Sequence, residues 1–389
     1  MNQRKYLLCF RIFVTSSNSN ASILSFLQRS TIKSISSTTS TPINIKFSLN
    51  EPRLSKRTTC GDLCTLTSNE FPILKKLSIQ HLVLQVGGVR EPHWHGNANK
   101  IIYCLYGSAL ITIVGNHGKY NTFGITEGQA CFVPSGYAHH VENMRKDGTS
   151  EFIIGLSHEL PEEFNFSMTF GPMSDKVLGN TFRLPDSAFK DVIKLKRGEP
   201  TLIGKMKQIT NVANDRVFTN SNEYKFDFER RAFTLTFPEG SIKIASHKHW
   251  PIIKNISMSS LCISAQSIRE PYWRPEAAEM GLVVNGYARI SILLPNDGHQ
   301  LHTFSLQNYD VYFIPPGYPH YIENIGDADL KILMFFDQSN ADDIGYKGGL
   351  LAYSREVLSA TFQCDSKQIP TVSFNRQNLI VKRVNPIDN

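Results

Sequence analysis

Three features are absent from this sequence of 389 residues, and each absence excludes a class of protein. No apolar run approaches the roughly 20 residues that a membrane-spanning helix needs, so no transmembrane segment is expected. The seven cysteines contain no C-x-x-C pair, which argues against a zinc knuckle or a thiol redox motif. Beyond the N-terminal segment the charges nearly balance, so no basic footprint for nucleic acid exists. With 41% hydrophobic and 19% charged residues, the composition is that of a globular protein.

Acidic residues are also missing from residues 1–50, and the first carboxylate is that of Glu51. This segment holds six of the seven net positive charges, on Arg4, Lys5, Arg11, Arg29, Lys33 and Lys46. We expect residues 1–50 to be a targeting leader or a disordered segment. A basic, acid-free and Ser-rich leader is typical of a mitochondrial transit peptide. The apolar run YLLCFRIFV leaves a secretory signal as the alternative, and the sequons at Asn20, Asn165 and Asn255 fit secretion.

The sequence contains an internal repeat. REPHWHGNANK, which begins at Arg90, returns as REPYWRPEAAE at Arg269, an offset of 179 residues. FVPSGYAHHVEN at Phe132 returns as FIPPGYPHYIEN at Phe313, an offset of 181 residues. This duplication predicts two related domains, whose differences can be compared position by position.

Each half is predicted to consist of short β-strands followed by a helical segment. Strand-like runs such as IIYCLYG and GLVVNG alternate with turn signals such as GNHG at Gly115 and PNDG at Pro295. Helical periodicity appears only over residues 174–195 and 354–362, each opening with a Ser and an early acidic residue. We therefore predict an all-β protein with two β-barrels, each followed by a short helical segment. The predicted domains are residues 51–197 and 198–389.

Three histidines of the first half have the spacing of a metal site. His93 and His95 lie two residues apart in an extended strand, so both imidazoles point to one face. His139 follows the turn at Pro134 and Gly136. Three converging imidazoles would bind a divalent transition metal. The alternative is that these are structural or surface histidines.

These motifs resemble those of the cupin superfamily, G-x-H-x-H with a Glu four or five residues on, and P-x-G-x-x-H-x-x-x-N. The duplicated form, with R-E-x-H-W-H and a V-L-x-x-x-F helix, resembles the bicupin oxalate decarboxylases over roughly residues 65–370. The resemblance implies two jelly-roll barrels, each holding manganese through three His and one Glu. It also implies an Arg that orients oxalate, a proton-transferring Glu on a lid, and assembly into trimers or hexamers.

The first barrel matches this pattern incompletely. The histidine ligands are present, and Arg90 stands at the oxalate-orienting position. The Glu ligand is replaced by Lys100 when the following glycines are aligned, or by Asn99 in the shorter register. Glu162, beside Glu163, is the candidate for the lid carboxylate, although an exposed acidic loop is the simpler interpretation of this pair. Without a carboxylate, three imidazoles suit zinc, iron or copper better than manganese.

The second barrel retains the other half of the pattern. Glu279 and His320 match, but Tyr272 and Arg274 replace the two motif histidines. We expect the Arg274 guanidinium to pair with Glu279 in place of a metal. The equivalent arginine, Arg269, is retained, and like Arg90 it binds a substrate carboxylate or forms a structural ion pair. The protein is therefore expected to hold at most one metal ion, manganese or another divalent transition metal, in the first barrel.

Three functions are consistent with these residues. The first is an oxalate decarboxylase-like carboxy-lyase or metal-dependent oxidase whose activity on a small carboxylate is reduced, altered or lost. The second is a three-His iron enzyme similar to the dioxygenases of the cupin superfamily. The third is a non-catalytic bicupin, of the storage type or binding a small ligand. The residues leave open whether the protein is an enzyme.

Overall fold

The structure is a computed structural model that describes residues 44–190, 202–205, 222–295, 300–371 and 379–384. The leader as far as residue 43 and the domain boundary at residue 197 lie outside the described residues. Within these ranges, no helix is both long and apolar enough to cross a membrane.

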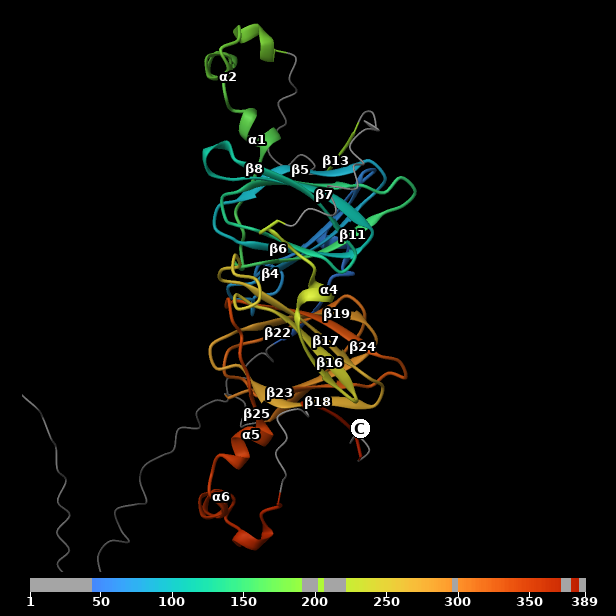
Figure 1. The fold of residues 1–389 in the computed structure, drawn as a ribbon, viewed down its shortest axis with the longest axis vertical. Coiled ribbons are helices and arrows are strands. Elements are labelled where there is room, and N and C mark those ends of the chain that lie inside the picture. Colours follow the sequence, from blue (N-terminus) through green and yellow to red (C-terminus); the bar gives the residue numbers. More distant parts are fainter. Residues whose placement is uncertain (1–43, 191–201, 206–221, 296–299, 372–378, 385–389) are drawn as a thin grey trace, which may run out of the picture. The chain divides into compact units, whose positions relative to one another are not determined.

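The predicted pair of β-barrels is confirmed (Figure 1), and each barrel consists of two antiparallel sheets. In the N-terminal barrel one sheet has the strand order β12-β5-β10-β7-β8, with β13 also paired to β5, and the other has the order β14-β9-β6-β11-β4-β3-β2. The strands are β2 (Ser55–Thr58), β3 (Gly61–Leu66), β4 (Ser78–Leu84), β5 (Gly88–His95), β6 (Lys100–Tyr106), β7 (Ser108–Val114), β8 (Tyr120–Thr126), β9 (Ala130–Val133), β10 (Ala138–Asn143), β11 (Ser150–Leu156), β12 (Glu163–Asn165), β13 (Leu202–Gly204) and β14 (Lys225–Phe226).

The C-terminal barrel repeats this arrangement. One sheet has the order β21-β20-β23-β18-β25, with β26 also paired to β18, and the other has the order β1-β22-β19-β24-β17-β16-β15. The strands are β1 (Lys46–Ser48), β15 (Phe233–Phe237), β16 (Gly240–Ala245), β17 (Ser257–Ile263), β18 (Ser267–Trp273), β19 (Glu279–Asn285), β20 (Ala288–Leu293), β21 (Leu301–Leu306), β22 (Asp310–Ile314), β23 (His320–Asn324), β24 (Leu330–Phe336), β25 (Ile344–Gly345) and β26 (Ile380–Lys382).

Each barrel receives one short strand from the chain segment that precedes the other barrel. β1 pairs with β22, with Lys46 opposite Tyr312, although β1 belongs to the expected leader segment. β14 pairs with β9 in the N-terminal barrel, with Lys225 opposite Cys131. The described residues of the 1–50 segment, from residue 44 on, therefore lie against the C-terminal barrel.

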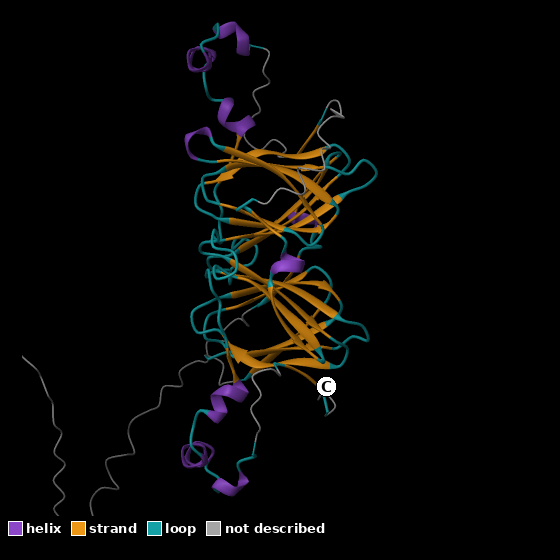
Figure 2. Ribbon diagram, viewed as in Figure 1, coloured by secondary structure: helices purple, strands orange, loops and turns teal. Residues whose placement is uncertain are grey.

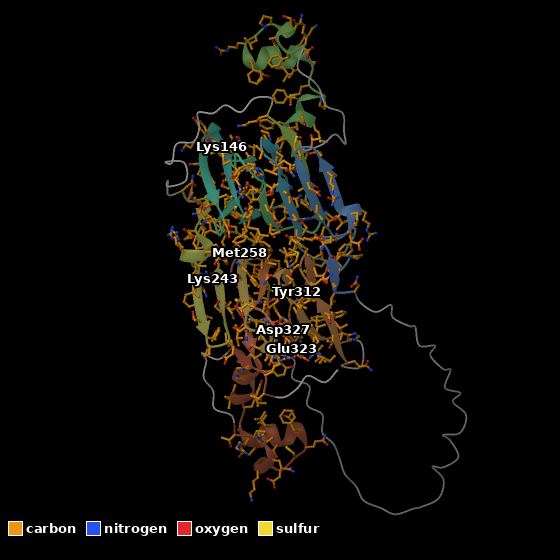
Figure 3. The ribbon with its side chains drawn as sticks, turned by 90° about the vertical axis from the view of Figure 1, so that its right-hand side faces the viewer. Lys146, Lys243, Met258, Tyr312, Glu323 and Asp327 are labelled. Carbon is orange, nitrogen blue, oxygen red and sulfur yellow. The ribbon has the colours of Figure 1, made fainter. Side chains whose placement is uncertain are left out.

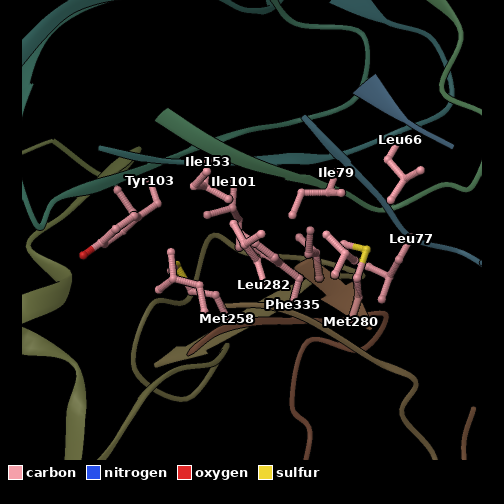
Figure 4. Packing of buried hydrophobic residues seen from close by; sticks show 14 of the residues in the cluster. Leu66, Leu77, Ile79, Ile101, Tyr103, Ile153, Met258, Met280, Leu282 and Phe335 are labelled. Carbon is pink, nitrogen blue, oxygen red and sulfur yellow. The ribbon is translucent and has the colours of Figure 1, made fainter. Parts of the chain in front are cut away.

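The two barrels share a hydrophobic core. Ile79, Ile101 and Ile153 of the N-terminal barrel belong to the same buried cluster as Met280 and Phe335 of the C-terminal barrel (Figure 4). Met258, labelled in Figure 3, also belongs to this cluster. The strands that carry these residues have both faces buried, which explains their nearly continuous hydrophobic sequences. Each barrel also has an interior core of its own.

Both predicted helical segments are present as helices (Figure 2). The helices are α1 (Phe166–Phe170), α2 (Asp175–Phe182), α4 (Phe228–Arg231), α5 (Tyr346–Leu351) and α6 (Arg355–Phe362), and the 3-10 turns are η1 (Pro52–Leu54), η2 (Asn116–Gly118), η3 (Asp186–Phe189) and η4 (Ser366–Gln368). Ser174 and Ser354 cap α2 and α6 by accepting the N–H of the third residue of each helix. The first helix is shorter than the predicted range of 174–195, because Arg183 adopts a left-handed conformation and Pro185 follows. Residues 191–195 lie outside the described ranges.

Gly155 of β11 allows the barrels to approach each other. A Cβ atom at this position would overlap the ring of Phe335 in the C-terminal barrel. We expect Gly155→Ala to lower the free energy of unfolding by about 1–3 kcal/mol, the usual cost of overpacking. Chemical denaturation measures this loss.

Gly349→Ala serves as the matched control. The added methyl group in α5 would meet only the edge of Trp273 at 3.6 Å, an ordinary contact. Because alanine favours helix over glycine, this variant should be neutral or slightly stabilised. Equal stability of the two variants would contradict the proposed role of Gly155.

Candidate metal centres

Strands β5 and β10 bring the three predicted histidines together in the N-terminal barrel. His139 lies directly opposite His93 in the strand register. The ring centroids of His93 and His139 are 4.2 Å apart, and those of His93 and His95 are 5.6 Å apart. All three side chains are buried. The pattern H-x-H followed by P-x-G-x-x-H therefore predicted a real cluster.

Lys100 joins two of these histidines. The Nδ1 atoms of His93 and His139 lie 2.7 and 3.1 Å from the backbone carbonyl oxygens of Glu91 and Tyr137. Each Nδ1–H therefore donates to a carbonyl, and each Nε2 carries a lone pair that faces the barrel interior. Lys100 Nζ lies 2.9 Å from His93 Nε2 and 3.0 Å from His139 Nε2. A lysine amine thus donates to the two nitrogens that a metal would bind.

Burial determines the protonation of this cluster. Burial, with the positive charge of Arg90, lowers the pKa of Lys100 to about 7. Burial also lowers the pKa of His93 and His139 well below the ordinary value, and Lys100 adds to this effect. Both imidazoles are therefore neutral acceptors at neutral pH.

Asn99, the alternative replacement for the Glu ligand, points away from the cluster. Its Nδ2 donates to the carbonyl of Lys254 at 2.8 Å, and its Oδ1 accepts the N–H of Ser135 at 2.9 Å. The structure therefore selects the register in which Lys100 stands at the Glu position.

Arg90 already holds a carboxylate of the protein itself. Strand β12 pairs with β5 so that Glu163 lies opposite His95. Glu163 Oε1 lies 2.5 Å from Arg90 Nη2, and Oε2 lies 3.5 Å from His95 Nε2. Burial alone would raise the pKa of Glu163, but Arg90 and His95 hold it well below its ordinary value. Glu163 is therefore ionised and occupies the arginine.

The structure separates the two neighbouring acidic residues of this segment. Glu162, our candidate for the lid carboxylate, is exposed, whereas Glu163 is directed toward Arg90. The expectation of an exposed acidic loop is correct for Glu162 and wrong for Glu163. The signal in the sequence was the alternation of EEFN, in which every second residue of a strand points to the same face.

The arrangement does not fit a divalent metal ion. A metal would lie about 2.0–2.2 Å from each imidazole nitrogen, in the space where Lys100 Nζ lies between His93 and His139. Lys100 Nζ occupies this space in either protonation state, its ammonium form also repels a divalent cation, and the position of the fourth ligand supplies no carboxylate. Among the described residues, no group of three or more His, Cys, Asp or Glu side chains is arranged to hold a metal.

In the C-terminal barrel the guanidinium group of Arg274 contacts the retained carboxylate of Glu279. Arg274 Nε lies 2.8 Å from Glu279 Oε2, the contact expected from the sequence, and Nη1 donates to the carbonyl of Ala341 at 2.6 Å. The hydroxyls of Tyr272 and Tyr312 also donate to Glu279, at 3.1 and 2.7 Å. Hydrogen-bond donors of the protein thus surround this carboxylate.

These contacts keep the buried pair charged. Burial opposes ionisation of Glu279, but the guanidinium of Arg274 holds the pKa of Glu279 well below its ordinary value. Glu279 in turn raises the pKa of Arg274 against the effect of burial. His320 lies 3.7 Å from Glu279, beyond hydrogen-bond distance. The pair is a buried salt bridge with nearly complete hydrogen bonding.

Both retained arginines form ion pairs. Arg269 Nη2 lies 2.9 Å from Asp343, and Arg90 has the same relation to Glu163. Asp343 directly precedes β25 and Glu163 begins β12, and these two strands pair with equivalent parts of β18 and β5. Each arginine therefore forms the structural ion pair that was one of its two interpretations.

The model of the cupin family matches residues 47–188 and 228–370. These two matches cover most of the sequence, so the chain belongs to the cupin family and is a bicupin. Its fold is the predicted pair of cupin barrels.

Within this family the chain resembles oxalate decarboxylase. Oxalate decarboxylase OxdC of Bacillus subtilis (strain 168) is 27% identical over 347 residues, which cover 87% of each chain. A solved structure of oxalate decarboxylase from Bacillus subtilis at pH 4.6 has a TM-score of 0.77 at 22% identity and covers 88% of this chain and 89% of its own. Germin-like protein subfamily T member 3 of Arabidopsis thaliana is 30% identical over 118 residues, 29% of this chain and 51% of its own.

The Arg274–Glu279 pair predicts a pH-dependent effect of Glu279→Gln. At pH 7 the variant leaves a buried guanidinium without its carboxylate, so the free energy of unfolding should fall by about 3–5 kcal/mol. The folded-state pKa of Glu279 lies below its ordinary value of 4.5, so the stabilisation is complete above about pH 4.5 and is lost on further acidification. The difference between wild type and variant should therefore shrink below that pH, as measured by denaturation at several pH values.

Asp62→Asn is the control for this experiment. It removes the exposed Arg57–Asp62 pair, whose arginine side chain is 78% exposed. Its cost should be at most about 1 kcal/mol. A Glu279→Gln variant that is no less stable than this control would contradict the role of the buried pair.

Proposed function

We propose that this protein is an oxalate decarboxylase-like bicupin whose decarboxylase activity is reduced or lost. One observation carries the proposal: Lys100 Nζ lies within hydrogen-bond distance of His93 Nε2 and His139 Nε2. In the barrel that kept the histidines, a lysine Nζ therefore stands where a metal would bind. Manganese or another divalent transition metal would bind at His93, His95 and His139 only if Lys100 left this position, so at most one metal is expected per chain.

The state of Arg90 supports the same proposal. A small carboxylate such as oxalate would have to displace Glu163 from Arg90 before it could bind there. Because this internal carboxylate is tethered to the neighbouring strand, its local concentration exceeds that of a free ligand. Substrate binding at Arg90 is therefore opposed by an intramolecular competitor.

The iron-enzyme and non-catalytic hypotheses place different requirements on the histidine cluster. A three-His iron enzyme needs the same three nitrogens free of Lys100, so the observed contacts disfavour it. A bicupin that binds a small ligand without catalysis needs no metal, and it is the alternative that agrees with the internal ion pairs.

Restoring the carboxylate tests the proposal. Lys100→Glu should bind about one Mn²⁺ per chain, because it supplies three imidazoles and one carboxylate. The wild-type protein should bind far less than one ion. Metal analysis after dialysis against Mn²⁺ measures both, and a formate-release assay with oxalate follows activity.

Two controls complete this experiment. Lys100→Met removes the lysine Nζ without adding a carboxylate, and Lys100→Glu combined with His95→Ala removes one of the native imidazoles; both should bind less Mn²⁺ than Lys100→Glu. Wild-type protein that carries stoichiometric manganese and releases formate, with both properties lost in His95→Ala, would overturn the proposal.

We also propose that the helical segments mediate assembly into a homo-oligomer, a trimer or hexamer by family resemblance. Val177 and Phe182 of α2 are 53% and 52% exposed, and the equivalent Val357 and Phe362 of α6 are 49% and 56% exposed. Matching apolar surface at equivalent positions of both halves suits contacts between copies of the chain.

Charge on this surface should disrupt assembly. The double variant Phe182→Glu and Phe362→Glu is expected to sediment as a monomer in analytical ultracentrifugation, while the wild-type protein forms the oligomer. Tyr120→Glu, at a 71% exposed position in strand β8, is the control and should assemble normally. A monomeric wild-type protein would contradict the proposal.

A further inference from the structure

The C-terminal barrel contains a cavity of about 1070 Å³. One wall is formed by β15, β16, β17 and β24, and the other by β18, β25 and the residues that precede β25. The cavity extends to Tyr272 and Arg274, the residues that replace the metal-binding histidines. This volume is ample for a small organic molecule.

Most of the inner wall is apolar. The side chains of five buried residues line it: Phe237, Ile242, Leu261, Met334 and Phe336. The half-buried Leu235 and Ile244 and the exposed Phe233 and Ile344 also line the cavity. Transfer of an apolar molecule from water to such a surface is favourable.

The basic groups of the cavity already have anionic partners. Arg269 is paired with Asp343 at 2.9 Å, and Arg274 with Glu279 at 2.8 Å. An anionic ligand would therefore have to compete with carboxylates of the protein. These pairs disfavour a carboxylate ligand in this cavity.

Glu270 is the polar group with an unfilled hydrogen-bonding position. The residue is 4% exposed and lines the cavity, and its Oε2 has no hydrogen-bond partner. Lys347 Nζ lies 3.9 Å from Oε2 and Arg269 Nη1 lies 3.8 Å from Oε1, both beyond hydrogen-bond distance. The Glu270 carboxylate accepts the backbone N–H of Lys347, as Glu91 accepts that of Ser167 in the N-terminal barrel, so Oε2 is the oxygen of Glu270 without a hydrogen-bond partner.

We infer that this cavity binds a neutral, mainly apolar molecule whose hydroxyl group donates a hydrogen bond to Glu270. The apolar wall selects the body of the ligand, and the unfilled acceptor selects a donor at its end. A hydroxyl fits better than an ammonium, because Arg269 and Lys347 would repel a cation beside Glu270. This site is independent of the proposed loss of decarboxylase activity.

Titration of the full chain with 1-naphthol, followed by fluorescence at pH 7, tests the inference. We expect saturable binding of one molecule per chain with a Kd on the order of 10–100 μM. The ether 1-methoxynaphthalene has the same rings and no donor, so it should bind about tenfold more weakly. The carboxylate 1-naphthoate should also bind more weakly than 1-naphthol.

Two variants locate the site. Leu235→Trp fills part of the cavity from the edge strand β15 and should weaken 1-naphthol binding at least about tenfold. Its matched control is Lys56→Trp, the equivalent position of β2 in the N-terminal barrel, which should bind normally. Glu270→Met should remove the preference for 1-naphthol over its ether, because the acceptor is gone.

These measurements can contradict either the location of the site or the class of ligand. Absence of saturable binding to the wild-type protein, or full binding to a folded Leu235→Trp variant, would overturn the site. Equal affinity for 1-naphthol and its ether, or tighter binding of 1-naphthoate, would overturn the neutral hydroxyl class. If Glu270→Met does not fold, the comparison of the three ligands on the wild-type protein still tests the hydroxyl contact.

Discussion

The hydrogen bonds from Lys100 to two imidazoles are the interaction on which the interpretation of this bicupin depends. The backbone carbonyls of Glu91 and Tyr137 fix the tautomers of His93 and His139, so two nitrogen lone pairs face one point. A metal ion would ordinarily satisfy these lone pairs. Here an amine does so from the position of the missing carboxylate. Lysine at residue 100 thus supplies no carboxylate ligand and also places its Nζ where a metal would bind.

In both barrels a basic side chain is hydrogen-bonded to the part of the metal site that remains. The N-terminal barrel has neutral imidazoles hydrogen-bonded to Lys100, whereas the C-terminal barrel has the anion Glu279 paired with the guanidinium of Arg274. Buried charge is costly unless it is paired and hydrogen-bonded. In each barrel the retained half of the metal site supplies the hydrogen-bond partner for the basic side chain, Lys100 or Arg274. The arginines at positions 90 and 269 follow the same rule, since each has acquired a carboxylate from a neighbouring segment.

Much of the fold could be predicted because its signals are local or repeated. Strand alternation, the Ser caps of α2 and α6, and the offset between the two halves all appear in short stretches of sequence. The end of α2 at Arg183 and the pairing of β1 with β22 could not be predicted, because both depend on backbone conformation and partners outside the local pattern. The requirement for glycine at position 155 could not be predicted either, because it comes from the ring of Phe335, 180 residues away in the sequence.

For the site, the sequence by itself determined which groups are present: three histidines without a carboxylate in one barrel, and a carboxylate with an arginine in the other. It also determined that Arg274 and Glu279 are close, because few residues separate them. Only the tertiary structure decided that Lys100 lies between His93 and His139, that Glu163 rather than Glu162 holds Arg90, and that Glu270 has an unfilled acceptor. The physical reason is that hydrogen-bond partners and burial are set by strands distant in the sequence, and these determine which charges are satisfied within the protein.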